Sequence, residues 1–138
     1  MISIVLLSQL FLDLRSSNFS GHIPHQLRNL SNLRYLDLRG NYYLYANNFH
    51  WKSNLSSIQF VDLSYSKHLI KVGWLQIMSM FPSLSTLHVS NCELVNLNPP
   101  LGFVNFTSLQ DLIFSVIFSV MRYLIGSLIL LRASCILT

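Results

Sequence analysis

The sequence predicts a repeat solenoid in which short parallel β-strands stack on a concave face. Irregular, 3-10 or short helical segments are expected to return along the convex side. The first observation is composition: of 138 residues, 27 are Leu, 20 are Ser and 11 are Asn, while 10% are charged. The second is a frame whose equivalent positions 12, 36, 61, 87 and 112 are separated by 24, 25, 26 and 25 residues. Because so steady a period indicates stacked repeats, residues 1–111 are expected to hold about four complete copies and the start of a fifth.

The cleanest copy of the frame is Leu33-x-x-Leu36-x-Leu38-x-x-Asn41. Its Leu-x-Leu centre alternates as a short strand with one buried face does. One copy cannot bury its apolar side alone, so the copies are expected to stack at the strand spacing of about 4.8 Å. Asn41 is expected to turn the chain and to pair backbone groups of the turn. Other copies have Ser17, Ser66 and Cys92 at this position, which predicts weaker pairing there.

The outward positions of the frame are the candidate ligand-binding residues, because repeat solenoids bind through their concave strands. Aromatic side chains there offer a large contact area, and guanidinium groups bind carboxylates with two hydrogen bonds. The alternative is an ordinary solvated strand surface. The candidates are Arg34, Tyr35, Asp37, Arg39, Gln59, Phe60, Asp62, Tyr65, Thr86 and His88.

Together with the frame, the segment Asn18-Phe-Ser-Gly-His-Ile-Pro24 resembles the plant-type leucine-rich repeat. Residues from about 74 to 109 resemble the N-terminal repeats of plant receptor-like proteins of the disease-resistance or elicitor-receptor type. That resemblance implies a cell-surface receptor with an extracellular repeat domain, one membrane helix and no kinase. It also implies a peptide or protein ligand, a co-receptor and no cofactor. Only the first copy keeps Gly-x-Ile-Pro, so the second strand of the plant class is expected there and not in the other copies.

The two ends of the chain depart from that family. Residues 1–12 are apolar but lack a basic region and a cleavage site, so we expect an incomplete N-terminus, with a poor or uncleaved signal segment as the alternative. Residues 112–131 are strongly apolar, and 20 residues of helix span about 30 Å, the thickness of a bilayer core. This segment is either a transmembrane helix or read-through from a truncated reading frame. Residues 132–138 form a short tail.

Four Asn-x-Ser/Thr sequons predict N-glycosylation and therefore a lumenal or extracellular setting. We expect the repeats to face outward at the plasma membrane, with a secreted protein as the alternative. The sequons are at Asn18, Asn29, Asn54 and Asn105.

The aromatic-rich segment 41–51 has two interpretations. It holds five aromatic residues, which either form an exposed recognition patch or cover the convex side of a longer repeat loop. The second is favoured, because large apolar side chains are usually buried.

Catalysis, metal binding and nucleic-acid binding find no support in the sequence. It contains no HExxH, GxSxG, P-loop or GxGxxG motif. The five acidic residues are spread one per repeat, so no general acid–base pair is apparent. The net charge of +4 is too scattered for a nucleic-acid surface, and His22 and His25 have too few neighbouring ligands for a metal site.

The sequence therefore predicts a recognition module rather than an enzyme. The first hypothesis is a fragment of a plant receptor-like ectodomain that binds peptides or proteins in defence or developmental signalling. The second is a small membrane-anchored repeat protein that associates with full-length receptors. The third is a secreted repeat inhibitor of a wall-degrading enzyme.

Overall fold

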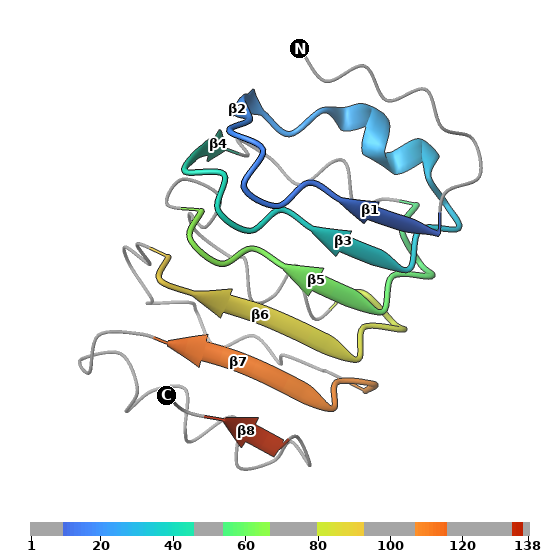
Figure 1. Ribbon diagram of the computed structural model, residues 1–138. Helices are drawn as coiled ribbons and strands as arrows, with labels where there is room; N and C mark the ends of the chain where they lie inside the picture. The colour runs from blue at the N-terminus through green and yellow to red at the C-terminus, as the bar shows by residue number, and fades with distance from the viewer. Residues whose placement is uncertain (1–9, 46–53, 67–79, 93–106, 116–133, 137–138) are drawn as a thin grey trace.

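A computed structural model of the chain describes residues 10–45, 54–66, 80–92, 107–115 and 134–136. These residues form short strands and one 3-10 helix, and they contain no α-helix. Figure 1 shows the main strands side by side, from β1 at one edge to β8 at the other. The elements in chain order are β1 (Phe11–Asp13), β2 (Ser20–His22), η1 (His25–Asn29), β3 (Tyr35–Asp37), β4 (Tyr43–Tyr45), β5 (Phe60–Asp62), β6 (Thr86–Ser90), β7 (Asp111–Ser115) and β8 (Ser134–Ile136).

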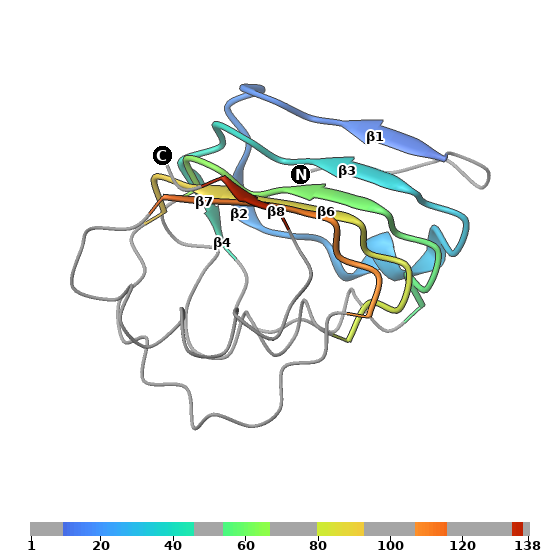
Figure 2. The same cartoon turned by 90° about the horizontal axis from the view of Figure 1, so that it is seen from below.

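The main sheet has six parallel strands in the order β1-β3-β5-β6-β7-β8. Each repeat contributes one strand, and the frame positions align across it: Leu12 pairs with Leu36, and Leu87 with Leu112. Figure 2 shows these strands as one continuous layer. The predicted parallel-strand solenoid and its register are confirmed.

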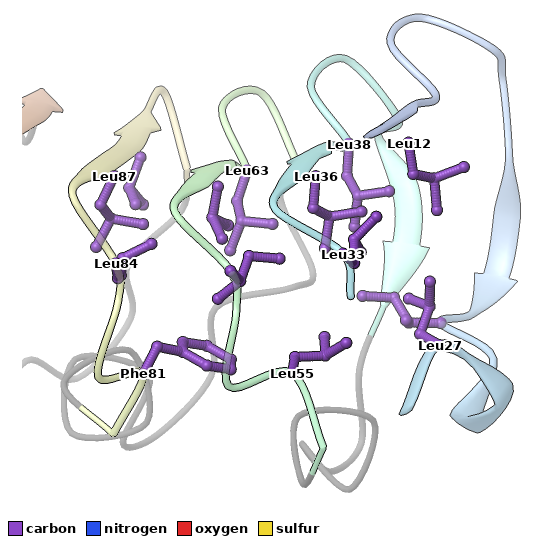
Figure 3. Close-up of a cluster of buried hydrophobic side chains, with 14 of the residues drawn as sticks. Leu12, Leu27, Leu33, Leu36, Leu38, Leu55, Leu63, Phe81, Leu84 and Leu87 are labelled. Carbon is purple, nitrogen blue, oxygen red and sulfur yellow. The ribbon is translucent and has the colours of Figure 1, made fainter. Parts of the chain in front are cut away.

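The inward leucines of successive repeats share one core, as Figure 3 shows for the labelled side chains. Leu33, Leu36 and Leu87 are fully buried. Leu27, Leu55 and Phe81 come from the segments that precede the strands and close the other side of this core. Burial of a leucine side chain stabilises the fold by about 1.5–3 kcal/mol, so the stacked leucines carry most of the stability.

A second, two-stranded parallel sheet joins β2 to β4. Gly21, at the centre of β2, has a φ of 93° and pairs with Leu44. The expectation that this second strand belongs to the first copy alone is wrong, because Tyr43–Tyr45 also adopts it. The reason is that strand pairing uses backbone groups, and Leu44, 1% exposed, anchors β4 without a Gly-x-Ile-Pro element.

The 3-10 helix η1 follows Pro24, which is extended (φ −67°, ψ 133°) and has no N–H with which to continue the pairing of β2 and β4. Leu27 is the buried side chain of η1, and the Leu30 backbone N–H donates to the Leu27 carbonyl. In Figure 2, η1 lies off one face of the main sheet. The expected 3-10 segment on the convex side is thus present in the first copy.

A left-handed residue ends the strand segment in each of four repeats. Ser16, Gly40, Tyr65 and Asn91 have φ values of 49°, 76°, 59° and 53°. A Cβ on Gly40 would lie 2.7 Å from the Ser16 Oγ, so only glycine fits there without movement. Glycine adopts this conformation freely and asparagine adopts it at low cost, whereas serine and, above all, a bulky tyrosine are strained in it.

The Asn41 side chain lies directly after this turn and is fully buried. Its amide nitrogen donates to the Leu14 and Leu38 carbonyls at 2.8 Å, and its oxygen accepts from the Phe19 backbone N–H at 3.0 Å. Ser66 makes one long bond of 3.4 Å to the Leu38 carbonyl. The predicted pairing of turn backbone by Asn41, and its weakening at Ser66, are both seen.

The C-terminal repeats correct the expected boundary at residue 112. Residues 112–115 belong to β7, which pairs with β6 in the main sheet, so the predicted helix does not begin at Leu112. Ser134–Ile136 adds a further parallel strand beside β7. Within the described ranges, no helix has the length and apolarity to cross a bilayer. Residues 116–133, which hold most of the predicted membrane segment, lie outside those ranges.

Candidate ligand-binding surface

The parallel register aligns the outward side chains of successive repeats into strips that cross the strands. The aromatic strip consists of Phe11, Tyr35 and Phe60, one from each of β1, β3 and β5. The carboxylate strip consists of Asp13, Asp37 and Asp62 at the next outward position. These two strips, with the arginines beside them, form the concave face of the first three repeats.

The rings of the aromatic strip are stacked face to face. The Phe11 and Tyr35 centroids are 3.9 Å apart with planes 6° from parallel, and those of Tyr35 and Phe60 are 4.2 Å apart at 7°. Phe60 then meets the His88 ring edge-on at 5.2 Å. Stacking uses the ring faces, so the ring edges are left to meet a ligand that crosses the strip.

The carboxylate strip is largely engaged within the protein. Asp13 receives the Arg15 guanidinium at 2.7 Å. Asp37 accepts bonds from the Arg39 backbone N–H at 3.0 Å and the Tyr35 hydroxyl at 3.2 Å. The expectation that Asp37 and Asp62 face a ligand needs correction, because they are only 2% and 3% exposed.

Burial and pairing shift neighbouring aspartates in opposite directions. Hydrogen bonds from Arg15 lower the pKa of Asp13 below its ordinary value of 3.8. Desolvation by burial raises the pKa of Asp37 above that value. Burial and the nearby Asp37 carboxylate also raise the pKa of the Tyr35 hydroxyl, so this hydroxyl stays protonated and donates.

Two exposed arginines bracket β3, and neither guanidinium has an ion pair or hydrogen bond among the described residues. Arg34 precedes the strand and Arg39 follows it. Arg15, the equivalent of Arg39 in the first repeat, is instead held by Asp13 and lies 3.5 Å from Asp37. The accessible charge around β3 is therefore positive.

His88 lies between carboxylates from the strands on either side of it. Its Nδ1 is 3.4 Å from the Asp62 Oδ2, and its buried Nε2 is 3.8 Å from the Asp111 Oδ2. The sequence places one acid in each repeat, and the parallel register brings these residues onto neighbouring strands of one face. Within the described ranges, no group of three potential ligands is placed to hold a metal ion.

The remaining candidates lie along the same face. Gln59 is exposed, Thr86 is half-buried beside Phe60 in the strand register, and Tyr65 is 41% exposed. Sequence reasoning missed Phe11 and Asp111 as outward-facing residues of the sheet. Both directly precede an inward Leu of the frame, as Tyr35 does, so the frame itself was the signal that could have found them.

The exposure of other surface residues bears on the predicted glycosylation sites and on the aromatic-rich segment 41–51. The sequon residues Asn18, Asn29 and Asn54 are all exposed, and Asn105 lies outside the described ranges. Tyr42 and Tyr43 are 49% and 66% exposed, so these two do not cover the convex core as expected. The remaining aromatic residues of that segment, apart from the half-buried Tyr45, lie outside the described ranges.

Comparison with known proteins agrees with this geometry. A family model described as Leucine Rich Repeat matches residues 10–30. Receptor-like protein EIX1 of Solanum lycopersicum is 43% identical over 89 residues, which are 64% of this chain and 8% of that protein. No solved structure matches the chain significantly. The repeats and their register are therefore those of a leucine-rich repeat solenoid, and over the matched residues the chain is similar to a plant receptor-like protein.

Proposed function

We propose that the chain is a recognition module of a plant cell-surface receptor-like protein, and that its concave face binds a peptide or protein. The observation that carries this proposal is the concave face of β1, β3 and β5. It combines an aromatic strip with two exposed arginines that have no ion pair among the described residues. Aromatic and arginine side chains dominate the binding energy of protein interfaces. The similarity to a receptor-like protein supports the same role.

We further propose that the repeats face outward at the plasma membrane and carry glycans. The exposure of Asn18, Asn29 and Asn54 supports this, because a sequon must be accessible to be glycosylated. The chain spans 8% of the length of the relative, so a co-receptor and a signalling partner belong to the proposal for the parent protein. The membrane-anchored alternative depends on residues 116–133, outside the described ranges.

A photocrosslinking experiment tests the concave face as the binding surface. A photoreactive residue is placed at Gln59 on that face or at Gln26 on η1, since both glutamines are exposed. The full chain is then incubated with extracellular wash fluid from plant tissue and illuminated. We expect discrete adducts from position 59 and none from position 26. Equal labelling at both positions, or none at position 59, would count against the proposal.

A further inference from the structure

The concave face also indicates the chemical class of the ligand. We infer that it binds an extended acidic peptide, with apolar side chains on the aromatic strip and carboxylates on Arg34 and Arg39. This inference rests on the proposed function, and it names the ligand class of the same surface. Three observations support it: the orientation of the rings, the engagement of the aspartates, and two guanidinium groups that have no ion pair within the part of the chain that the structure describes.

The orientation of the rings disfavours a carbohydrate. Both faces of the Tyr35 ring are covered, by Phe11 on one side and Phe60 on the other. Sugars and cations bind aromatic faces, and the negative charge of the ring quadrupole lies there. The edges carry the positive end of the quadrupole, so they suit apolar side chains, carbonyl oxygens and carboxylates. The centre of the strip at Tyr35 therefore fits a peptide better than a sugar or a basic group.

The carboxylates of this surface are not available to bind a basic peptide. Asp37 and Asp62 are buried, and Asp62 accepts the Ser64 backbone N–H at 2.8 Å. Asp13 is paired with Arg15 through two hydrogen bonds of 3.0 Å from the Arg15 Nε. A cationic ligand would have to displace these internal partners, whereas an anionic ligand meets Arg34 and Arg39 without displacing any described partner.

The spacing of the two arginines sets a length for the ligand. Arg34 and Arg39 are five residues apart, which is at most about 17 Å along an extended strand. An extended peptide covers that distance in about five residues. The Asp111 carboxylate on β7, whose side chain is 43% exposed, would repel an acid there, so the acidic residues are expected beside β3, where Arg34 and Arg39 lie.

Selection from a random 12-residue peptide library, displayed on phage and panned against the full chain, tests this inference. We expect enriched peptides to carry two acidic residues about five positions apart with aromatic or aliphatic residues between them. The double substitution Arg34→Gln/Arg39→Gln should weaken their binding about tenfold. Because neither guanidinium has a described contact, the double variant should melt at the same temperature as the wild type. Arg28→Gln is the matched control, since Arg28 is exposed on η1, and it should leave the affinity unchanged.

The outcomes separate the ligand class from the proposed function. Enriched peptides that are neutral or basic, yet bind less well when Phe60 is changed to Ala, would overturn the acidic class and keep the concave face as the binding surface. Acidic peptides that bind the double variant as well as the wild type would also overturn the inference. Enrichment of no peptide, or of peptides indifferent to both the arginine and Phe60 substitutions, would count against the proposed function too. Binding of a cello-oligosaccharide that Phe60→Ala abolishes would make the surface a carbohydrate site instead.

Discussion

The first three repeats and the next two share one framework and differ in the face that they present. Strands β1, β3 and β5 carry an aromatic residue and then an aspartate at their outward positions. Strand β6 carries Thr86 and His88 there, and β7 carries Asp111 and Ile113. The inward positions stay aliphatic and buried in both regions, from Leu36 to Leu112.

This difference shows that the two faces of each strand have separate roles. The inward leucines set the register, because a slip by one residue would turn every buried side chain outward. The outward positions do not set the register, and their side chains differ between the first three repeats and the next two. The proposed recognition chemistry is therefore concentrated on the first three repeats, while the next two extend the same sheet.

If both regions share one stacked core of inward leucines, truncating equivalent leucines should lower the free energy of unfolding equally. Leu36→Ala in β3 and Leu87→Ala in β6 remove side chains that are both fully buried. Each is expected to lower the free energy of unfolding by about 3 kcal/mol, within the range for leucine-to-alanine changes in cores. Urea denaturation of the full chain, followed by circular dichroism, measures both. A difference well above 1 kcal/mol would show that the two regions do not share one framework.

The polar side chain that follows the left-handed turn should contribute unequally to stability in different repeats. Asn41→Ala leaves two backbone carbonyls and one N–H without their side-chain partner, and each buried unpaired group costs about 1 kcal/mol or more. We expect a loss of about 2–3 kcal/mol in the free energy of unfolding. The matched change Ser66→Ala removes one long bond and should cost about 1 kcal/mol or less. Equal losses in urea denaturation would argue that the Ser66 side chain stabilises its turn as strongly as the Asn41 side chain does.

These contrasts also show which features the sequence could predict. The period near 25 residues predicted the sheet and its register, because each inward Leu has an equivalent one repeat away. It did not predict β8, since Ser134–Ile136 lacks the Leu-x-Leu centre, or β4, which is anchored by Leu44 alone. The burial of Asp37 arises from neighbouring strands, and the His88 environment joins residues that are distant in the chain. Both need the stacking of repeats and cannot be read from a single copy.

Asp13 and Asp37 occupy the same frame position in the first and second repeats, but their pKa values are shifted in opposite directions. As the pH falls from 7, Asp37 should take up its proton first, above the ordinary value of 3.8, and Asp13 last. A raised pKa means that the charged form is disfavoured by folding, so protonation of Asp37 adds stability as the pH falls through that pKa. The lowered pKa of Asp13 has the opposite sign, and its contribution is lost as the pH falls through that lower value.

Carboxyl carbon chemical shifts, followed by NMR during an acid titration, measure this order directly. Assignment uses Asp13→Asn and Asp37→Asn, each of which should remove one transition. Asp37→Asn should also flatten the gain in stability on mild acidification, and Asp13→Asn should flatten the loss at lower pH. Titration of Asp13 before Asp37 would contradict the burial and pairing described for the carboxylate strip.

The smallest effect concerns Tyr65, whose backbone conformation disfavours the bulky side chain that it presents to solvent. Its φ of 59° places a bulky side chain in the left-handed region that Ser16, Gly40 and Asn91 occupy in other repeats. Tyr65→Asn should relieve that strain and raise the free energy of unfolding by about 1 kcal/mol, at the lower end of the range for a strained backbone. Tyr65→Phe keeps the strain and should leave stability unchanged. Since the tyrosine is 41% exposed, its ring contributes little to the core.

If Tyr65→Asn instead destabilises the chain in urea denaturation, packing holds the ring in place, and the tyrosine is not retained for recognition. If the variant is stabilised and binds the selected peptides less well, the strain at Tyr65 is tolerated for binding.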